Sequence, residues 1–459
     1  MTKASLRVIG LYLLISVVVF DGVLRRLAGP VAANYFFFVK DVVALFFIIV
    51  GRGGESDRVR SFFRLHGLPL LMIALIPPCV VQTLYLDPIL ALFGAKQYLL
   101  YPWIAYAVFR VMGELSLDKF ERILKYILFL IIGTSALAVL QLELPSDNFF
   151  NQSVGGETME DFSAGGYLRV CSTFPFVGQY CYFLNFTFPF LFCIPRIRAN
   201  ASAMVSFITR PAVVIPVYLA GAFATASRTA VWGGGAIAGA TAICLLFTRR
   251  WIQSARLVAF IAILGACTLM LNVFLPQTLA GYSVRSAGEL GYSHVQEMLD
   301  RISYMLVGWI SEADVTIFGH GLGTMSNGAD QISHAAAQIR SGGFWTENDL
   351  ASTFFEGGCY WLVIWMGMRL FVIFDAIRVA RSVRTGRMAM FSAALTGYII
   401  VQGFMGTLGI QPPLAIWFWI AVGLNYAVAM QDANATAQFE WENHLVRISR
   451  QQVQPPSPT

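Results

Sequence analysis

Residues 256–275 read RLVAFIAILGACTLMLNVFL, an apolar run that is followed by a long polar stretch from residue 277 to residue 349. A helix needs about 20 mainly apolar residues to cross a membrane, so the run predicts a membrane span. The whole chain of 459 residues is 57% hydrophobic and only 13% charged, with a mean hydropathy of +0.64. Soluble domains do not have this composition, and we therefore expect an all-α, polytopic bundle of membrane helices.

Similar apolar runs recur along the chain and predict about twelve spans. The first run lacks a small-residue cleavage site and is followed closely by the second, so we expect it to remain as an anchor. The predicted spans are 7–24, 34–50, 68–86, 95–112, 124–142, 176–194, 211–225, 230–247, 256–275, 350–374, 389–408 and 413–430.

Lys and Arg gather in alternate loops between these spans, which marks those loops as cytoplasmic. Both termini are then expected inside, and segments 143–175 and 277–349 outside. The cations that carry this assignment are Arg52, Arg58, Arg60, Arg64, Lys119, Arg122, Arg196, Arg198, Arg210, Arg249, Arg250, Arg378, Arg381, Arg384 and Arg387.

Four regions follow from this topology. Residues 1–276 hold the first nine spans, with a short outer loop at 143–175, and residues 277–349 form a large outer loop with amphipathic helices. Residues 350–430 hold the last three spans. Residues 431–459 are expected to form a cytoplasmic tail, with a short interfacial helix around Trp441 followed by disorder.

Several function classes are disfavoured by the sequence. The net charge of +6 is spread over the loops without a dense basic run, so nucleic acid is not an expected partner, whereas membrane lipid is. The seven Cys show no metal-type spacing. No nucleotide-binding motif is present, and we expect no metal and no soluble cofactor.

Three arginines are predicted at the outer boundary of the bundle. Arg169 precedes the sixth span, Arg228 lies between the seventh and eighth spans, and Arg301 lies on a stretch with helical apolar spacing. A cation beside an apolar span is a candidate functional group, and guanidinium groups match phosphate oxygens. If the three converge they would bind a diphosphate; alternatively, Arg228 snorkels at a helix end and Arg301 faces water or an acidic neighbour.

Further candidates lie at the end of the polar stretch. His320, between glycines in GHGLGT, and Glu347 in TENDL are candidate proton acceptors. Asn348, Asp349 and Glu356 are candidate supporting groups, because Asp349 and Glu356 lie about two helical turns apart and would share one face. The simpler interpretation is that His320 is a structural loop residue and that the carboxylates at 347 and 349 favour a helix start.

Lys40 and Asp41 lie inside an apolar span, after the charged segment DGVLRR at residues 21–26. An adjacent pair of opposite charges is expected to be mutually neutralised. A structural lock between the first helices is the favoured interpretation of this pair, and a supporting role in a site is the alternative.

Seven features, taken in order, resemble the O-antigen polymerase and ligase superfamily. They are DGVLRR, the pair Lys40–Asp41, Arg169 before a span, SRTA at 227–230, DRISYMLVGW at 300–309, GHGLGT, and a last segment with Asn348 and Glu356–Gly357 that enters a helix. The resemblance extends over nearly the whole chain. It implies a GT-C-like bundle in the bacterial inner membrane with its active site facing the periplasm.

The resemblance also implies a glycosyltransferase that uses an oligosaccharide linked to undecaprenyl diphosphate. Ligases of this family carry a His beside the Asn of the last motif, where this chain has Glu347. We therefore expect a polymerase for exopolysaccharide, capsule or O-antigen, acting with a chain-length regulator and a flippase. The alternatives are a ligase that transfers the glycan to lipid A core, and a transporter or flippase of a lipid-linked glycan.

Overall fold

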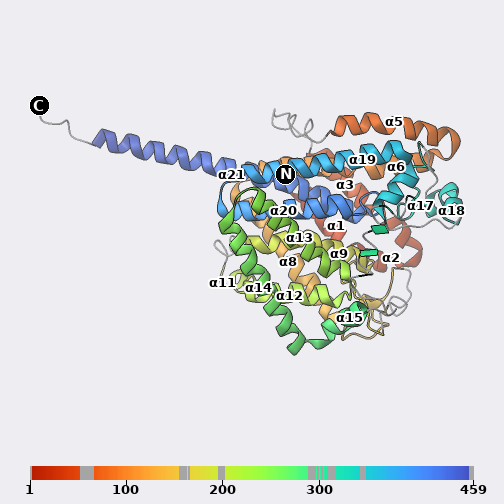
Figure 1. Ribbon diagram of the computed structural model, residues 1–459, viewed down its shortest axis with the longest axis horizontal. Coiled ribbons are helices and arrows are strands. Elements are labelled where there is room, and N and C mark those ends of the chain that lie inside the picture. Colours follow the sequence, from red (N-terminus) through yellow and green to blue (C-terminus); the bar gives the residue numbers. More distant parts are fainter. Residues whose placement is uncertain are drawn as a thin grey trace, which may run out of the picture.

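The computed structural model describes residues 3–51, 67–154, 163, 166–194, 202–287, 317–341 and 348–453, together with positions 296, 299–300, 303–304, 307 and 310. Its elements are helices packed side by side (Figure 1). The α-helices are α1 (Lys3–Val19), α2 (Asp21–Phe36), α3 (Val39–Gly51), α5 (Leu68–Tyr85), α6 (Pro88–Leu99), α7 (Pro102–Gly113), α8 (Leu117–Gln141), α9 (Val177–Thr187), α11 (Ala203–Ile208), α12 (Pro211–Ala224), α13 (Arg228–Phe247), α14 (Trp251–Phe274), α15 (Pro276–Ala287), α17 (Ala329–Ile332), α18 (His334–Ser341), α19 (Asp349–Ser382), α20 (Gly386–Met405) and α21 (Pro412–Val453), and two 3₁₀ turns cover Phe149–Asn151 and Phe188–Cys193.

Six described helices are long and apolar enough to cross a membrane, and a seventh span results if α1 and α2, which meet at a bend of 62°, are counted together. The six are α5, α8, α13, α14, α20 and α21. The chain is thus an all-helical, multi-pass membrane protein. Each of the twelve predicted runs contains a helix, but the expectation that each forms one span of full length is only partly confirmed.

Two of the predicted spans are interrupted for visible reasons. The run at 95–112 is divided between α6 and α7, and α7 begins at Pro102, which has no backbone N–H to continue a helix. The run at 350–374 lies in α19, which is bent at Gly358, where φ is 63° and ψ is −165°. This backbone conformation is accessible essentially only to glycine.

The helices connect at two opposite ends of the bundle (Figure 1). Helix α11 and the C-terminal part of α21 lie at one end, and α2, α17 and α18 lie at the other. Helix α11, from a predicted inner loop, thus lies opposite α17 and α18, from the predicted outer loop. Helix α21 continues to Val453, beyond the short interfacial helix expected around Trp441.

Small residues let the central helices approach closely. A Cβ on Gly423 of α21 would lie 2.2 Å from the carbonyl oxygen of Ala105 in α7, and one on Gly397 of α20 would lie 2.8 Å from that of Ile237 in α13. The fully buried side chains around them include Trp361, Trp365, Trp417, Trp419 and Tyr98.

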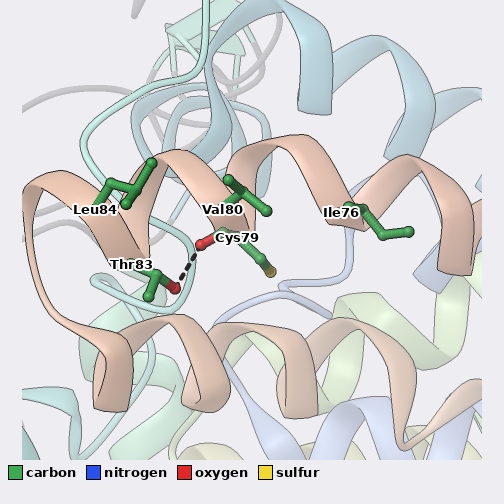
Figure 2. A pocket seen from close by; sticks show the side chains of 5 residues that line it. All are labelled: Ile76, Cys79, Val80, Thr83 and Leu84. Atoms are coloured by element: carbon green, nitrogen blue, oxygen red, sulfur yellow. Dashed lines mark hydrogen bonds between the residues drawn. The ribbon is translucent and has the colours of Figure 1, made fainter.

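The outermost helices expose apolar faces. Only 17% of the apolar window of α14 is buried, against 83% of that of α21. Helix α5, at the top of Figure 1, carries a shallow hollow of about 320 Å³, shown in Figure 2. The one hydrogen bond drawn there is internal to the helix, from the Thr83 hydroxyl to the Cys79 carbonyl oxygen at 2.7 Å. This surface suits contact with lipid chains.

Candidate functional site

The segment GHGLGT, residues 319–324, forms a tight turn that we call the glycine turn. Gly319, Gly321 and Gly323 all have positive φ, between 69° and 119°, which side chains rarely tolerate. The turn lies against α19, because the His320 and Gly321 N–H groups donate to the Phe355 and Glu356 carbonyl oxygens at 2.8 and 2.9 Å. The glycines therefore permit a close approach of this turn to α19.

Two residues of α5 and α6 hold the glycine turn from the other side. The Gln82 side chain accepts from the Leu322 N–H and donates to the Leu322 carbonyl oxygen, both at 3.0 Å. A Cβ on Gly94 would lie 2.4 Å from that carbonyl oxygen. Leu322 is fully buried, so the turn is an anchored part of the bundle.

Glu356 is the buried acid beneath the glycine turn. Its carboxylate accepts from the Tyr98 hydroxyl at 2.5 Å and from the Met325 N–H at 2.7 Å, and its side chain is fully buried. Tyr98 is held edge-on between Trp361 and Trp365, with ring centroids 5.0 and 4.9 Å away. Glu356 thus connects α19, α6 and the segment after the glycine turn through one carboxylate.

Asp349 and Arg369 form a second buried charged centre next to the first. Arg369 pairs with the Asp349 carboxylate, and its other N–H groups donate to the carbonyl oxygens of Gln402 at 3.2 Å, Gly403 at 2.8 Å and Gly406 at 2.7 Å. The Gly409 N–H completes the centre by donating to Asp349 at 3.1 Å. The C-terminal end of α20 is thereby fixed to α19.

Glycine 409 joins the two centres. A Cβ at this position would lie 2.8 Å from the Tyr98 hydroxyl, and its N–H binds Asp349. Asp349 and Glu356 are both buried, and each carboxylate is occupied by hydrogen bonds within the protein.

Of the two candidate proton acceptors, the structure describes His320. The His320 ring is half-buried and lies against the Phe355 ring, with centroids 4.4 Å apart. Asn348 is the N-cap of α19, and its side chain accepts from the Leu350 N–H at 3.0 Å. Asn348 therefore caps α19, and Asp349 lies in the first turn of that helix, while Glu347 lies outside the described residues.

Two of the three candidate arginines belong to segments that meet. Tyr167 and Ala226, each two residues before an arginine, have Cβ atoms within 3.1 Å of the position that a Cβ on Gly281 of α15 would take. Arg169 and Arg228 are both half-buried. Arg301 lies outside the part of the chain that the structure describes, so its approach to the other two stays a prediction.

Both arginine segments contain a backbone outlier. Ala226 has φ 47° and Ser172 has φ 54°, although neither is a glycine. Such conformations cost about 1–3 kcal/mol and tend to occur at functional sites. Arg228 is the first residue of α13, whose initial N–H groups have no partner within the helix.

The interpretation of Lys40 and Asp41 as a mutually neutralising pair is wrong. The Lys40 ammonium faces Asp21 of α2 at 3.8 Å and lies 3.6 Å from the centre of the Phe37 ring. The Asp41 carboxylate instead binds Lys96 at 2.7 Å and the Tyr101 hydroxyl at 2.6 Å. Neighbours on a helix point about 100° apart, so each charge finds its partner on another helix, and the pair does lock the first helices together.

Sequence reasoning did not single out Gln82, Gly94, Tyr98 or Arg369. Arg369 had a usable signal, because it interrupts the apolar run WLVIWMGMRLFVIF, and an ionisable residue within a span is unusual. The other three had none, because their partners lie far away in sequence.

Among the described residues, no group of three or more His, Cys, Asp or Glu side chains is arranged to hold a metal ion. The polar groups gathered here are arginines, carboxylates, one histidine and backbone N–H groups. No protein-family model matches the chain, and none of the curated proteins compared with it is similar enough to count as a relative.

Proposed function

We propose that this chain is a polysaccharide polymerase of the inner membrane, a glycosyltransferase that joins oligosaccharide repeat units carried on undecaprenyl diphosphate. In this proposal the bundle has about twelve membrane passes, and the site opens to the periplasm. The products are exopolysaccharide, capsule or O-antigen. The main support for this proposal is that the segments containing Arg169 and Arg228 meet around Gly281.

Arg169, Arg228 and Arg301 bind the donor diphosphate and stabilise the charge that develops on the leaving group. Preorganised cations suit this task, and the N–H groups at the start of α13, beside Arg228, favour anions as well. The strained backbones at Ala226 and Ser172 support the same location.

Glu347 or His320 removes the proton from the acceptor sugar hydroxyl, which then attacks the anomeric carbon as the carbon–oxygen bond to the diphosphate breaks. A single direct displacement inverts the configuration at that carbon. His320 lies against Phe355 of α19, and Glu347 directly precedes Asn348, the N-cap of the same helix, in the sequence. Glu356 and Asn348 support this arrangement by fixing the glycine turn and the helix start.

The test uses purified protein in lipid vesicles with undecaprenyl-diphosphate-linked repeat units. Elongation is the expected result. Arg169→Ala and Arg228→Ala should each lower the rate about 100-fold, since one lost transition-state contact costs about 3 kcal/mol. Arg210→Ala is the control, because Arg210 is exposed and precedes α12 at the opposite end of the bundle.

The other possible outcomes would indicate a different function or a different site. Transfer of the glycan to lipid A core without elongation would identify a ligase, and movement across the vesicle membrane without new linkages would identify a transporter. Full activity of both arginine variants would remove the diphosphate site from these segments.

A further inference from the structure

Arg26 is a buried cation at the outer end of the bundle that the proposed function leaves without a role. It lies in α2, which follows α1 after the 62° bend, and its exposed fraction is 9%. A Cβ on Gly22 of the same helix would lie 2.2 Å from the backbone of Phe174. Helix α2 therefore packs directly on the segment that carries Arg169.

The Arg26 guanidinium is held in place by that outer segment. Its Nε donates to the Gln152 carbonyl oxygen at 2.8 Å, and its Nη2 contacts the Cys171 sulfur at 3.0 Å and the Phe174 carbonyl oxygen at 3.1 Å. Cys171 is two residues from Arg169 in the chain, so Arg26 contacts the segment that carries Arg169.

The charge of Arg26 is not neutralised by any residue that the structure describes. No described carboxylate lies within ion-pair distance of it, and its Nη1 is buried without a hydrogen-bond partner in that part of the chain. A buried, uncompensated charge costs several kcal/mol. The hydrogen bonds of Nε and Nη2 thus orient the Arg26 guanidinium, and Nη1 can still donate to a ligand.

The neighbouring thiol does not supply the missing negative charge. Burial raises the pKa of the Cys171 thiol, and this effect exceeds the opposing effect of the Arg26 charge. The sulfur is therefore a neutral partner at neutral pH and does not compensate the charge of Arg26.

We propose that Arg26 binds a phosphate oxygen through Nη1, beside Arg169, and that the ligand is the diphosphate group of the polyprenyl-linked donor. This inference rests on the proposed function and adds a binding residue to it. A buried guanidinium with two nitrogens fixed is preorganised for an oxyanion.

Arg25 provides a matched control in the same helix. It is half-buried, its Nε donates to the Ala33 carbonyl oxygen at 3.1 Å, and its guanidinium lies 5.6 Å from the centre of the Phe37 ring. Replacing Arg25 removes the same charge from the neighbouring position of the same helix but leaves the contacts to Gln152, Cys171 and Phe174 intact.

The experiment measures binding of farnesyl diphosphate to the full chain in phosphatidylcholine nanodiscs. Arg26→Gln should weaken binding at least tenfold, Arg26→Lys at least threefold, and Arg25→Gln less than threefold. A purely structural role would lower the melting temperature of the free protein without changing the stabilisation that the ligand adds. If Arg26→Gln does not fold, Arg26→Lys decides, and wild-type affinity in it overturns the proposal.

Two further comparisons distinguish a diphosphate donor from a lipid headgroup as the bound phosphate. They also test the role of Arg26 separately from the proposed function. Binding of farnesyl diphosphate is compared between phosphatidylcholine and phosphatidylglycerol nanodiscs. If phosphatidylglycerol weakens binding only when Arg26 is present, the oxyanion site is supported and a lipid headgroup competes for it. Wild-type affinity of Arg26→Gln in both lipids would mean that the protein itself neutralises Arg26. Loss of binding in Arg169→Ala and Arg228→Ala alone would then leave the proposed function standing, whereas full binding in every variant would contradict both.

Discussion

Asp349 and Arg369 lie 20 residues apart in one helix, α19, and still form an ion pair that is 4% and 0% exposed at its two side chains. In a straight helix they would be separated by about 30 Å. The contact is made because the helix bends at Gly358, so that its first turns lie back over the following segment. Three carbonyl oxygens at the end of α20 then complete the donors of Arg369.

Arg369→Lys should destabilise the protein by about 2–4 kcal/mol. Lysine keeps the charge but cannot donate simultaneously to Asp349 and to the carbonyl oxygens of Gln402, Gly403 and Gly406. The control is Arg378→Lys in the same helix, because the Arg378 side chain is 60% exposed in its pair with Asp375 and such pairs contribute under about 1 kcal/mol. Thermal unfolding in detergent compares the two variants. Equal melting temperatures would mean that the fork of hydrogen bonds does not stabilise α19.

Tyr98→Phe should cost about 1.5–3 kcal/mol, because it removes a hydrogen bond to the buried Glu356 carboxylate while the ring stays packed on Trp361 and Trp365. Tyr360→Phe removes a hydroxyl that donates to the neutral Ala74 carbonyl oxygen at 3.0 Å and should cost about 1 kcal/mol. Denaturant titration of both variants gives the difference. A larger loss in Tyr360→Phe would show that Glu356 does not depend on Tyr98.

Gly94→Ala should displace the glycine turn, because the new Cβ would lie 2.4 Å from the Leu322 carbonyl oxygen. We expect a loss of about 1–3 kcal/mol, typical of overpacking, and faster protease cleavage in segment 317–341. Gly133→Ala is the control, since a Cβ there meets nothing within 4 Å, and it should be neutral or stabilise α8 by up to about 1 kcal/mol. Unchanged cleavage in Gly94→Ala would contradict the anchoring of the turn.

Asp87→Asn should lower the melting temperature at neutral pH and lose this effect in acid. Asp87 caps α6 by accepting from the Ile89 N–H at 2.8 Å and also accepts from the Ser333 hydroxyl. The Ser333 hydrogen bond is the main cause that lowers the pKa of Asp87. A lowered pKa in the folded state stabilises the protein above the unfolded pKa of about 3.9, and this stability disappears as pH falls through the folded pKa.

Melting temperatures of wild type and Asp87→Asn between pH 7 and the acid limit of the protein test this prediction. Ser333→Ala should give a smaller change, because it leaves the cap on α6 intact. A difference between wild type and Asp87→Asn that grows on acidification would have the wrong sign and would reject the assignment.

Hydropathy was sufficient to predict helices at all twelve runs, but not the lengths of the helices. Lengths depend on local breaks, such as Pro102 and the bend at Gly358, and a window average does not register them. Positive φ at the glycines of GHGLGT followed from the motif itself, because clustered glycines predict a tight turn.

The candidate site was predictable only where charge stood out against an apolar background. Lys40 and Asp41 stood out, but their partners did not, because Asp21 and Lys96 are brought to them by helix packing. Gln82 and Tyr98 lie in apolar helices, and their roles become visible only through their contacts with Leu322 and Glu356 in the folded chain. These contacts join residues more than 200 positions apart, and the periodicity of a single sequence does not indicate such contacts.

The acceptors of Arg369 have a consequence for biosynthesis. An arginine at the centre of a lone helix raises the cost of membrane insertion by about 2.5–3.5 kcal/mol, and three of the oxygens that satisfy Arg369 belong to residues 402–406 of the chain. Those residues leave the ribosome after the arginine does. Helices α19 and α20 would therefore enter the lipid as a pair, with the earlier helix waiting at the translocon for the later one.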